Sequence, residues 1–283
     1  MTLSKTRIGI AGLGQIGGSI AARLHADNAT PSLLGFDIRT DLCQAAIKGG
    51  IVARIAESEA ELVNCSDIVV MALPISEILS FMTRHRDALI SKLAVTDTGS
   101  IKAEVMAHAT RLGFRNFVGG HPMAGTEKRG AASWNPDLFQ GAVFFVTPGK
   151  VTSQQAIAAV AALLSQLGAH PVPAEPEKHD RIVATTGNLT HLLAYRLLEQ
   201  YAAIDHNGVD TSQFQGPSFL SATRVAHSDQ ETAFQMLWHN RENLAASLRS
   251  FIDGLDEAAQ ALESGDADRF RHALYGSREG VNL

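Results

Sequence analysis

The chain has 283 residues, of which 45% are apolar and 6% aromatic, and its formal net charge is −5. This length predicts one large domain or two moderate ones with a buried core. The basic residues are scattered, which excludes a nucleic-acid surface built from clustered Lys and Arg. No apolar run approaches the roughly 20 residues that cross a bilayer, so no membrane partner is expected.

Cysteine usage and the chain ends favour a cytoplasmic protein. Only Cys43 and Cys65 are present, too few for a disulfide framework. From the start, MTLSKTR, we expect no secretion signal, and from the end, SREGVNL, no added regulatory domain. No metal site is expected, because the sequence has no His-Glu-x-x-His motif and the two cysteines are far apart.

The N-terminal part alternates short β-branched runs with amphipathic segments, which is typical of a Rossmann-like, doubly wound, mainly parallel α/β sheet. Thr40 and Ser153 are expected helix N-caps, while Gly49, Gly113 and Gly168 are expected to end helices. The expected strands cover residues 7–11, 33–37, 67–73, 93–97, 116–119 and 142–147.

From about residue 174 little is typical of strand. Residues 179–204 and 228–263 carry apolar residues at three- and four-residue spacing, which predicts two long helices. We therefore expect a sheet domain over residues 1–173 and an all-helical domain over residues 174–283. So much apolar helix surface favours a homodimer through the C-terminal helices, although the helices could instead pack on one another within one chain.

A glycine-rich motif follows the first strand in RIGIAGLGQIGGSIAARL (residues 7–24). Its first glycine suits the tight turn, the second a close approach of pyrophosphate, and the third close helix–strand packing. The following helix would direct its N–H groups at the phosphates. Alone the motif is weak, because methyltransferases and structural turns share it. The expected cofactor contacts here are Gly12, Leu13, Gly14, Gln15, Ile16 and Gly17.

The end of the second strand bears on the choice of cofactor. Asp37, 25 residues after Gly12, is placed to accept hydrogen bonds from a ribose 2′-hydroxyl and to repel a 2′-phosphate, which favours NAD. Arg39 could accommodate that phosphate, so NADP stays possible, and Asp37 could instead cap the next helix. Ile38 is expected beside the ribose.

Ligands of an open α/β sheet bind beyond the carboxyl ends of its strands. Leu73, Pro74 and Thr98 are therefore expected at the cofactor. Ser100, in DTGSIK, either serves the reaction or caps the next helix. His121, in GGHPMAGTEKRG, can accept a proton from a substrate hydroxyl near neutral pH, although a lone histidine is often structural.

Five stretches together, GLGQIGGSIA, DTGSIK, GGHPMAGTEKRG, ATRVA and NRENL, resemble the prephenate and arogenate (cyclohexadienyl) dehydrogenases of tyrosine biosynthesis. The resemblance implies a dinucleotide-binding domain followed by a helical dimerisation domain. It also implies an oxidative decarboxylation, in which hydride leaves C4 of a cyclohexadienol for the nicotinamide, the C4 hydroxyl becomes a carbonyl, and the C1 carboxylate departs as carbon dioxide.

The resemblance also implies roles for individual residues. His121 would accept the hydrogen bond or proton of the C4 hydroxyl, and Ser100 would help to fix that hydroxyl and the nicotinamide. Arg224, in ATRVA, would pair with a substrate carboxylate, a task that suits its planar fork, although it could be a surface arginine. The further substrate contacts are Thr126, Lys128, Asn188 and His191.

One stretch departs from the family pattern. Many relatives carry Ser-His-x-Pro-His where this chain has GNLTH, so Asn188 replaces a histidine and Thr190 a proline, while His191 remains. An amide both donates and accepts hydrogen bonds, which leaves prephenate, arogenate and an amino-substituted prephenate open as substrates.

Two other functions are compatible with parts of this sequence. The β-hydroxyacid dehydrogenases and imine reductases share the layout, but they place a lysine where this chain has Ala184. A non-catalytic dinucleotide-binding regulator would not need Ser100, His121 and Arg224 together.

Overall fold

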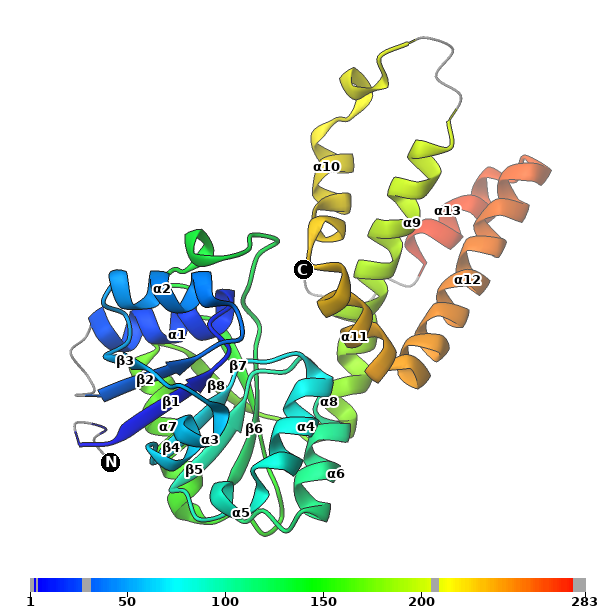
Figure 1. Cartoon of the computed structure of the whole chain (residues 1–283). Coiled ribbons are helices and arrows are strands. Elements are labelled where there is room, and N and C mark those ends of the chain that lie inside the picture. The colour runs from blue at the N-terminus through cyan, green and yellow to red at the C-terminus, as the bar shows by residue number, and fades with distance from the viewer. Residues whose placement is uncertain (1–2, 4, 27–31, 205–208, 277–283) are drawn as a thin grey trace.

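The computed structural model describes residue 3 and residues 5–26, 32–204 and 209–276. The expectation about the C-terminal SREGVNL lies outside these residues, as do residues 1, 2 and 4 of MTLSKTR. Within them, a sheet covered by helices on both faces is followed by a group of helices that extends away from it (Figure 1). This arrangement confirms the expected fold class. No described helix is both long and apolar enough to cross a bilayer.

Eight strands form one sheet in the order β3-β2-β1-β4-β5-β6-β7-β8. All neighbours pair in parallel except β6 and β7, which are antiparallel. The edge strands β3 and β8 were missed by the sequence analysis, because one has only two residues and the other contains two prolines, which suit an edge. The bounds are β1 (Arg7–Ala11), β2 (Ser32–Phe36), β3 (Arg54–Ile55), β4 (Ile68–Met71), β5 (Ala94–Asp97), β6 (Phe117–Pro122), β7 (Val143–Pro148) and β8 (His170–Pro173).

The helices around the sheet begin and end close to the expected positions. Ser153 is an N-cap as predicted, with its hydroxyl accepting from the N–H of Ala156, and Gly113 and Gly168 follow helices with positive φ. Thr40 is the first helical residue rather than the N-cap, which is Arg39. The bounds are α1 (Gln15–Ala26), α2 (Thr40–Lys48), α3 (Glu59–Asn64), α4 (Ile75–Arg84), α5 (Arg86–Leu89), α6 (Ala103–Arg111) and α7 (Gln154–Gln166).

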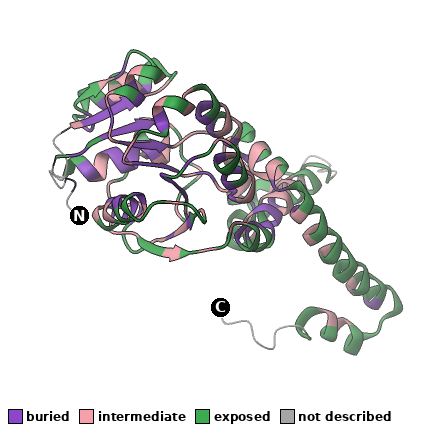
Figure 2. Cartoon of the chain, turned by 90° about the horizontal axis from the view of Figure 1, so that it is seen from below, coloured by how far each residue is buried: buried purple, intermediate pink, exposed green. Residues whose placement is uncertain are grey.

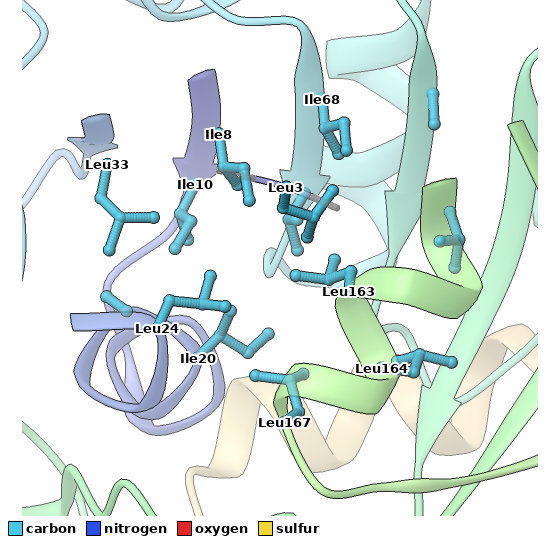
Figure 3. Packing of buried hydrophobic residues seen from close by; sticks show 14 of the residues in the cluster. Leu3, Ile8, Ile10, Ile20, Leu24, Leu33, Ile68, Leu163, Leu164 and Leu167 are labelled. Atoms are coloured by element: carbon cyan, nitrogen blue, oxygen red, sulfur yellow. The ribbon is translucent and has the colours of Figure 1, made fainter. Parts of the chain in front are cut away.

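Two apolar clusters form the core, one on each face of the sheet. Because side chains alternate along a strand, Ile68 and Val70 of β4 join the cluster beneath α1 and α7, while Val69 and Met71 join the one beneath α4 and α6. Figure 3 shows the first cluster, where β1 side chains meet α1 and α7. The carboxyl ends of the parallel strands are thereby held on a rigid platform.

The two long expected helices are each interrupted. The first starts at Pro176 and contains a π-helical segment, and the second breaks at Asn240. Figure 2 shows that burial is concentrated around the sheet, whereas α12 is mostly exposed. The bounds are α8 (Pro176–Val183), η2 (Ala184–Leu189), α9 (Thr190–Ala202), α10 (Pro217–Thr223), α11 (Gln230–His239), α12 (Arg241–Ser264) and α13 (Ala267–Tyr275).

Candidate active site

His121 lies inside β6, not beyond its end as the sequence analysis expected. The strand continues to Pro122, and His121 is opposite Phe145 of β7. The preceding glycine is required by close packing, because a Cβ on Gly120 would lie 2.5 Å from the backbone oxygen of Asp97. The imidazole is therefore carried by a hydrogen-bonded strand rather than by a loop.

A chain of hydrogen bonds begins at the His121 ring. Its Nδ1 lies 2.9 Å from Nε2 of His179, and Nδ1 of His179 lies 2.7 Å from Oδ1 of Asp180. The carboxylate of Asp180 also accepts the backbone N–H groups of Lys102 at 2.7 Å and Ala103 at 2.8 Å, at the start of α6. Both His179 and Asp180 are buried, and they belong to α8, so this chain joins the helical part to the sheet.

The pKa of His121 is held well below its usual value. The largest cause is burial of the ring, and the neighbouring His179 and Lys102 act in the same direction. The Nε2 atom of His121 forms no hydrogen bond to any residue that the structure describes. A neutral imidazole with a free nitrogen can accept a proton at neutral pH.

A second buried cluster connects the Ser100 loop to the same strand. The Asp97 carboxylate accepts the N–H groups of Gly99 at 2.8 Å and Gly120 at 3.0 Å, and it pairs with the buried ammonium of Lys102. That ammonium also donates to the Gly120 carbonyl at 2.7 Å. Burial lowers the pKa of Lys102, and the Asp97 carboxylate opposes this shift.

Ser100 lies between Gly99 and Lys102, both of which are bound to Asp97, and it is half-buried. The alternative that Ser100 caps α6 is wrong, because the N-cap residue is Lys102 and the helix N–H groups are bound by Asp180. The Ser100 hydroxyl forms no hydrogen bond among the described residues, so it is available to a ligand.

The glycine loop has the shape that a dinucleotide requires. Gly12 has φ +89°, and a Cβ on it would lie 2.2 Å from the Ala72 carbonyl. A Cβ on Gly17 would lie 1.9 Å from the Gly12 carbonyl, which shows how closely the helix packs on the turn. A Cβ on Gly14 would meet nothing within 4 Å, so that side of the loop is open to a phosphate. The side chain of Leu13 is fully buried, and its backbone N–H and carbonyl are bound by Asp37 and Trp134.

The end of β2 fits an unphosphorylated ribose. The Asp37 carboxylate accepts the N–H of Leu13 at 2.6 Å and the N–H of Arg39 at 2.8 Å, so it faces the glycine loop rather than capping α2. The Arg39 guanidinium pairs with Asp41 at 2.6 Å. Ile38 is 88% exposed, and its contact with the ribose stays a prediction.

The other expected cofactor residues lie at neighbouring strand ends. Leu73 and Pro74 lie between β4 and α4, where Leu73 is half-buried and Pro74 is exposed at the start of the helix. The N–H of Thr98 donates to the Met71 carbonyl at 3.1 Å, which holds the ends of β4 and β5 together.

The segment after His121 lies on the glycine loop. Gln15 donates to the Thr126 hydroxyl at 2.6 Å and accepts the Thr126 N–H at 2.7 Å. The indole of Trp134 donates to the carbonyls of Leu13 at 3.0 Å and Gly14 at 3.1 Å. The glycine-rich stretch and the stretch after His121 are therefore in direct contact, and Ile16 packs against the core.

Arg224 lies in a short 3₁₀ segment (Arg224–His227), and its guanidinium binds Glu127 at 2.9 Å. It also lowers the pKa of His191, although burial of that ring is the larger cause. Arg224, Glu127 and His191 therefore lie at the same border between the helices and the loop after β6. Lys128 forms no side-chain hydrogen bond in this group among the described residues: its side chain is exposed, its backbone N–H donates to Thr126, and its charge contributes only a minor part of the lowered pKa of Glu127.

Asn188 is fully buried in the π-helical segment, and its Oδ1 accepts from Nδ2 of Asn240 at 2.6 Å. The same Asn240 amide donates to the backbone carbonyl of Asp180 at 2.8 Å. Asn188 Nδ2 and His191 Nδ1 have no partner among the described residues. Asn188 thus belongs to the packing behind the His121–His179–Asp180 chain.

Four residues of this site were missed by sequence reasoning: Lys102, Glu127, His179 and Asp180. Glu127 lies between Thr126 and Lys128, which the sequence analysis did name. The one sequence feature that could have indicated Glu127 is the need of Arg224 for an ion-pair partner. His179 and Asp180 form an adjacent His-Asp pair at a helix start, but nothing in the sequence links that pair to His121, 58 residues earlier. Among the described residues no group of three or more His, Cys, Asp or Glu side chains could hold a metal ion.

Comparison with known proteins identifies the family. The model of the prephenate dehydrogenase nucleotide-binding domain matches residues 20–172, and that of the prephenate dehydrogenase dimerization domain matches residues 175–275. The chain belongs to the prephenate dehydrogenase family. This confirms the resemblance seen in the sequence and makes the protein an oxidoreductase.

Relatives extend over the whole chain. Prephenate dehydrogenase of Bacillus subtilis is 31% identical over 289 residues, covering 100% of this chain and 78% of the relative. Cyclohexadienyl dehydrogenase of Zymomonas mobilis is 29% identical over 95% of this chain and 92% of the relative. The crystal structure of Aquifex aeolicus prephenate dehydrogenase in complex with hydroxyphenyl propionate and NAD+ matches with a TM-score of 0.89 and 25% identity, over 99% of this chain and 98% of that one.

A more distant likeness concerns the fold alone. A pyrroline-5-carboxylate reductase of Coxiella burnetii matches with a TM-score of 0.52 and 15% identity over 99% of this chain. A reductase of another family thus shares the layout of this chain.

The contacts of Asp37 predict cofactor preference. In the Asp37→Asn variant the ratio of kcat/KM with NADP to kcat/KM with NAD should rise about tenfold, because the ribose loses a charged acceptor and the 2′-phosphate loses a repelling charge. Initial rates with each nucleotide measure this ratio. Asp268→Asn, which removes an equal charge from a side chain that is 95% exposed on α13, should leave it unchanged. An unaltered ratio in Asp37→Asn would remove Asp37 from the ribose site.

Proposed function

We propose that this protein catalyses the NAD-dependent oxidative decarboxylation of prephenate, arogenate or both. The observation that carries the proposal is the place of the His121 imidazole, which lies on β6 beside a loop that contacts the glycine turn, where burial lowers its pKa. Family membership supplies the reaction class, and the relatives' names supply the substrates. The proposed domains are residues 1–173, which bind the dinucleotide, and residues 174–283, which are helical.

His121 is the proposed base. When bound, NAD accepts the hydride that leaves C4 of the ring. Nε2 of His121 takes the proton of the C4 hydroxyl, so that oxygen becomes a carbonyl. The electron pair of the bond between C1 and its carboxylate then enters the ring as carbon dioxide leaves. His121 returns its proton to the phenolate oxygen, which leaves an aromatic product and a neutral histidine.

Ser100 and Arg224 orient the substrate in this proposal. The free Ser100 hydroxyl donates to or accepts from the C4 oxygen. The Arg224 guanidinium binds a substrate carboxylate through a charge-assisted pair, in place of Glu127, which holds it in this structure at 2.9 Å. Thr126 and His191 are the further substrate contacts in this proposal, while the exposed side chain of Lys128 can reach only the rim and the fully buried Asn188 acts from behind the site.

We also propose a homodimer that forms through the C-terminal helices. The dimerization-domain match covers residues 175–275. Several large apolar side chains of this part are about half exposed in the single chain, which supports a partner surface. They include Leu197, Trp238, Ile252, Leu255 and Leu262.

The decisive experiment offers the purified protein prephenate and arogenate, each with NAD and with NADP, and follows absorbance of the reduced nicotinamide. We expect turnover of at least one substrate and faster rates with NAD. A blank in all four combinations would contradict the proposal and favour a binding protein without catalysis.

The His121→Asn variant should bind NAD as tightly as the wild type but turn over at least about 10²-fold more slowly, because general base catalysis is lost. NAD titration measures the affinity, and stopped-flow rates measure the turnover. A variant that retained most of its turnover would exclude His121 as the base.

The wild-type kcat/KM should stay level from pH 8 to below 6.5 and fall only at lower pH, since the pKa of His121 is depressed and only its neutral form accepts a proton. Initial rates across this pH range measure the profile.

A further inference from the structure

His179 has no role in the reaction described above, yet its ring is only 3% exposed and lies between the proposed base and a carboxylate. The His121 and His179 rings are nearly perpendicular, with planes at 80° and centroids 5.1 Å apart, and Phe145 packs against His179 at the same centroid distance. Packing therefore allows each ring little freedom to turn, and the positions of the ring protons follow from the neighbouring groups.

Asp180 decides the proton position on His179. Its Oδ1 accepts the N–H of Lys102, and its Oδ2 accepts the N–H of Ala103; a backbone N–H can only donate. The carboxylate therefore acts as an acceptor toward all its neighbours. Nδ1 of His179, 2.7 Å from Oδ1, must carry the hydrogen of that bond.

The proton position on His179 determines the proton position on His121. A neutral His179 with hydrogen on Nδ1 has a bare Nε2, which can only accept. The hydrogen in the 2.9 Å bond between the two rings must then come from Nδ1 of His121. The opposite tautomer of His121 would place two lone pairs face to face in a buried site. Nε2 of His121 is thus left bare, as a base needs.

We propose that His179 and Asp180 are positioning residues that hold His121 in the tautomer with Nδ1 protonated and Nε2 free to accept the substrate proton. The proposal rests on the proposed function of His121 as the base. Asp180 acts through two bonds and never meets the substrate. Because the backbone N–H groups that orient Asp180 come from α6, the base acquires its tautomer only where α8 docks on the sheet.

Two amide substitutions that differ by one methylene test the proposal. The Asn side chain of His179→Asn can reach Asp180 but not His121, so kcat should fall about 10²-fold with the KM values for substrate and NAD within about threefold of the wild type. In His179→Gln the longer side chain directs its NH₂ toward Asp180 and its oxygen toward Nδ1 of His121. This variant should retain kcat within about tenfold of the wild type.

His85→Asn serves as the control, because His85 also pairs with a carboxylate, Glu59 at 2.8 Å, but lies at the junction of α4 and α5. Its kcat should stay near the wild-type value. Wild-type kcat in a folded His179→Asn variant would overturn the proposal, and so would a folded His179→Gln variant as slow as His179→Asn. The proposed function itself fails if the wild type is inactive or if His121→Asn keeps its activity. The His179 variants test the positioning role separately, in a protein whose wild type is active and whose His121→Asn variant is not.

Discussion

The buried carboxylate of Asp180 is the contact on which the arrangement of the site depends. It belongs to α8 but accepts two backbone N–H groups from the start of α6, where the helix dipole also favours a negative charge. Hydrogen bonds to a charged group contribute about 1.5 to 3 kcal/mol each, and an unpaired buried carboxylate would cost several. The carboxylate is therefore satisfied in only one docking position of the helical part.

A second buried pair gives the sheet side of the site its rigidity. The Lys102 ammonium and the Asp97 carboxylate bind each other and the backbone of Gly99 and Gly120, so the Ser100 loop and the His121 strand move together. Lys102 also offers its N–H to Asp180. One residue thus takes part in both clusters, which couples the position of the loop to that of the helical part.

Local patterns in the sequence were sufficient for much of this account. The glycine turn, Asp37, the six main strands and His121 as a candidate base follow from spacing and residue type, because each depends on neighbours within one βα unit. His179, Asp180 and Glu127 could not be found in this way, since their partners lie 58, 77 and 97 residues away along the chain. The extension of β6 through His121 depends on pairing with β7, which periodicity does not show.

The interruptions of the long helices have the same origin. Residues 179–204 have a helical pattern throughout, but Asn188 lies in a π-helical segment and bonds to Asn240, where the second helix breaks. Apolar spacing predicts where a helix can form, whereas these breaks come from side chains that satisfy buried polar groups in a neighbouring element.

The most direct measurement is the ¹⁵N NMR spectrum of the protein labelled at its histidines, recorded at neutral pH, with the His121→Asn variant to assign the His121 signals. The account predicts that the proton of the neutral His121 ring is on Nδ1 and that Nε2 has the shift of a bare nitrogen. A His121 ring that carries its hydrogen on Nε2 would contradict it.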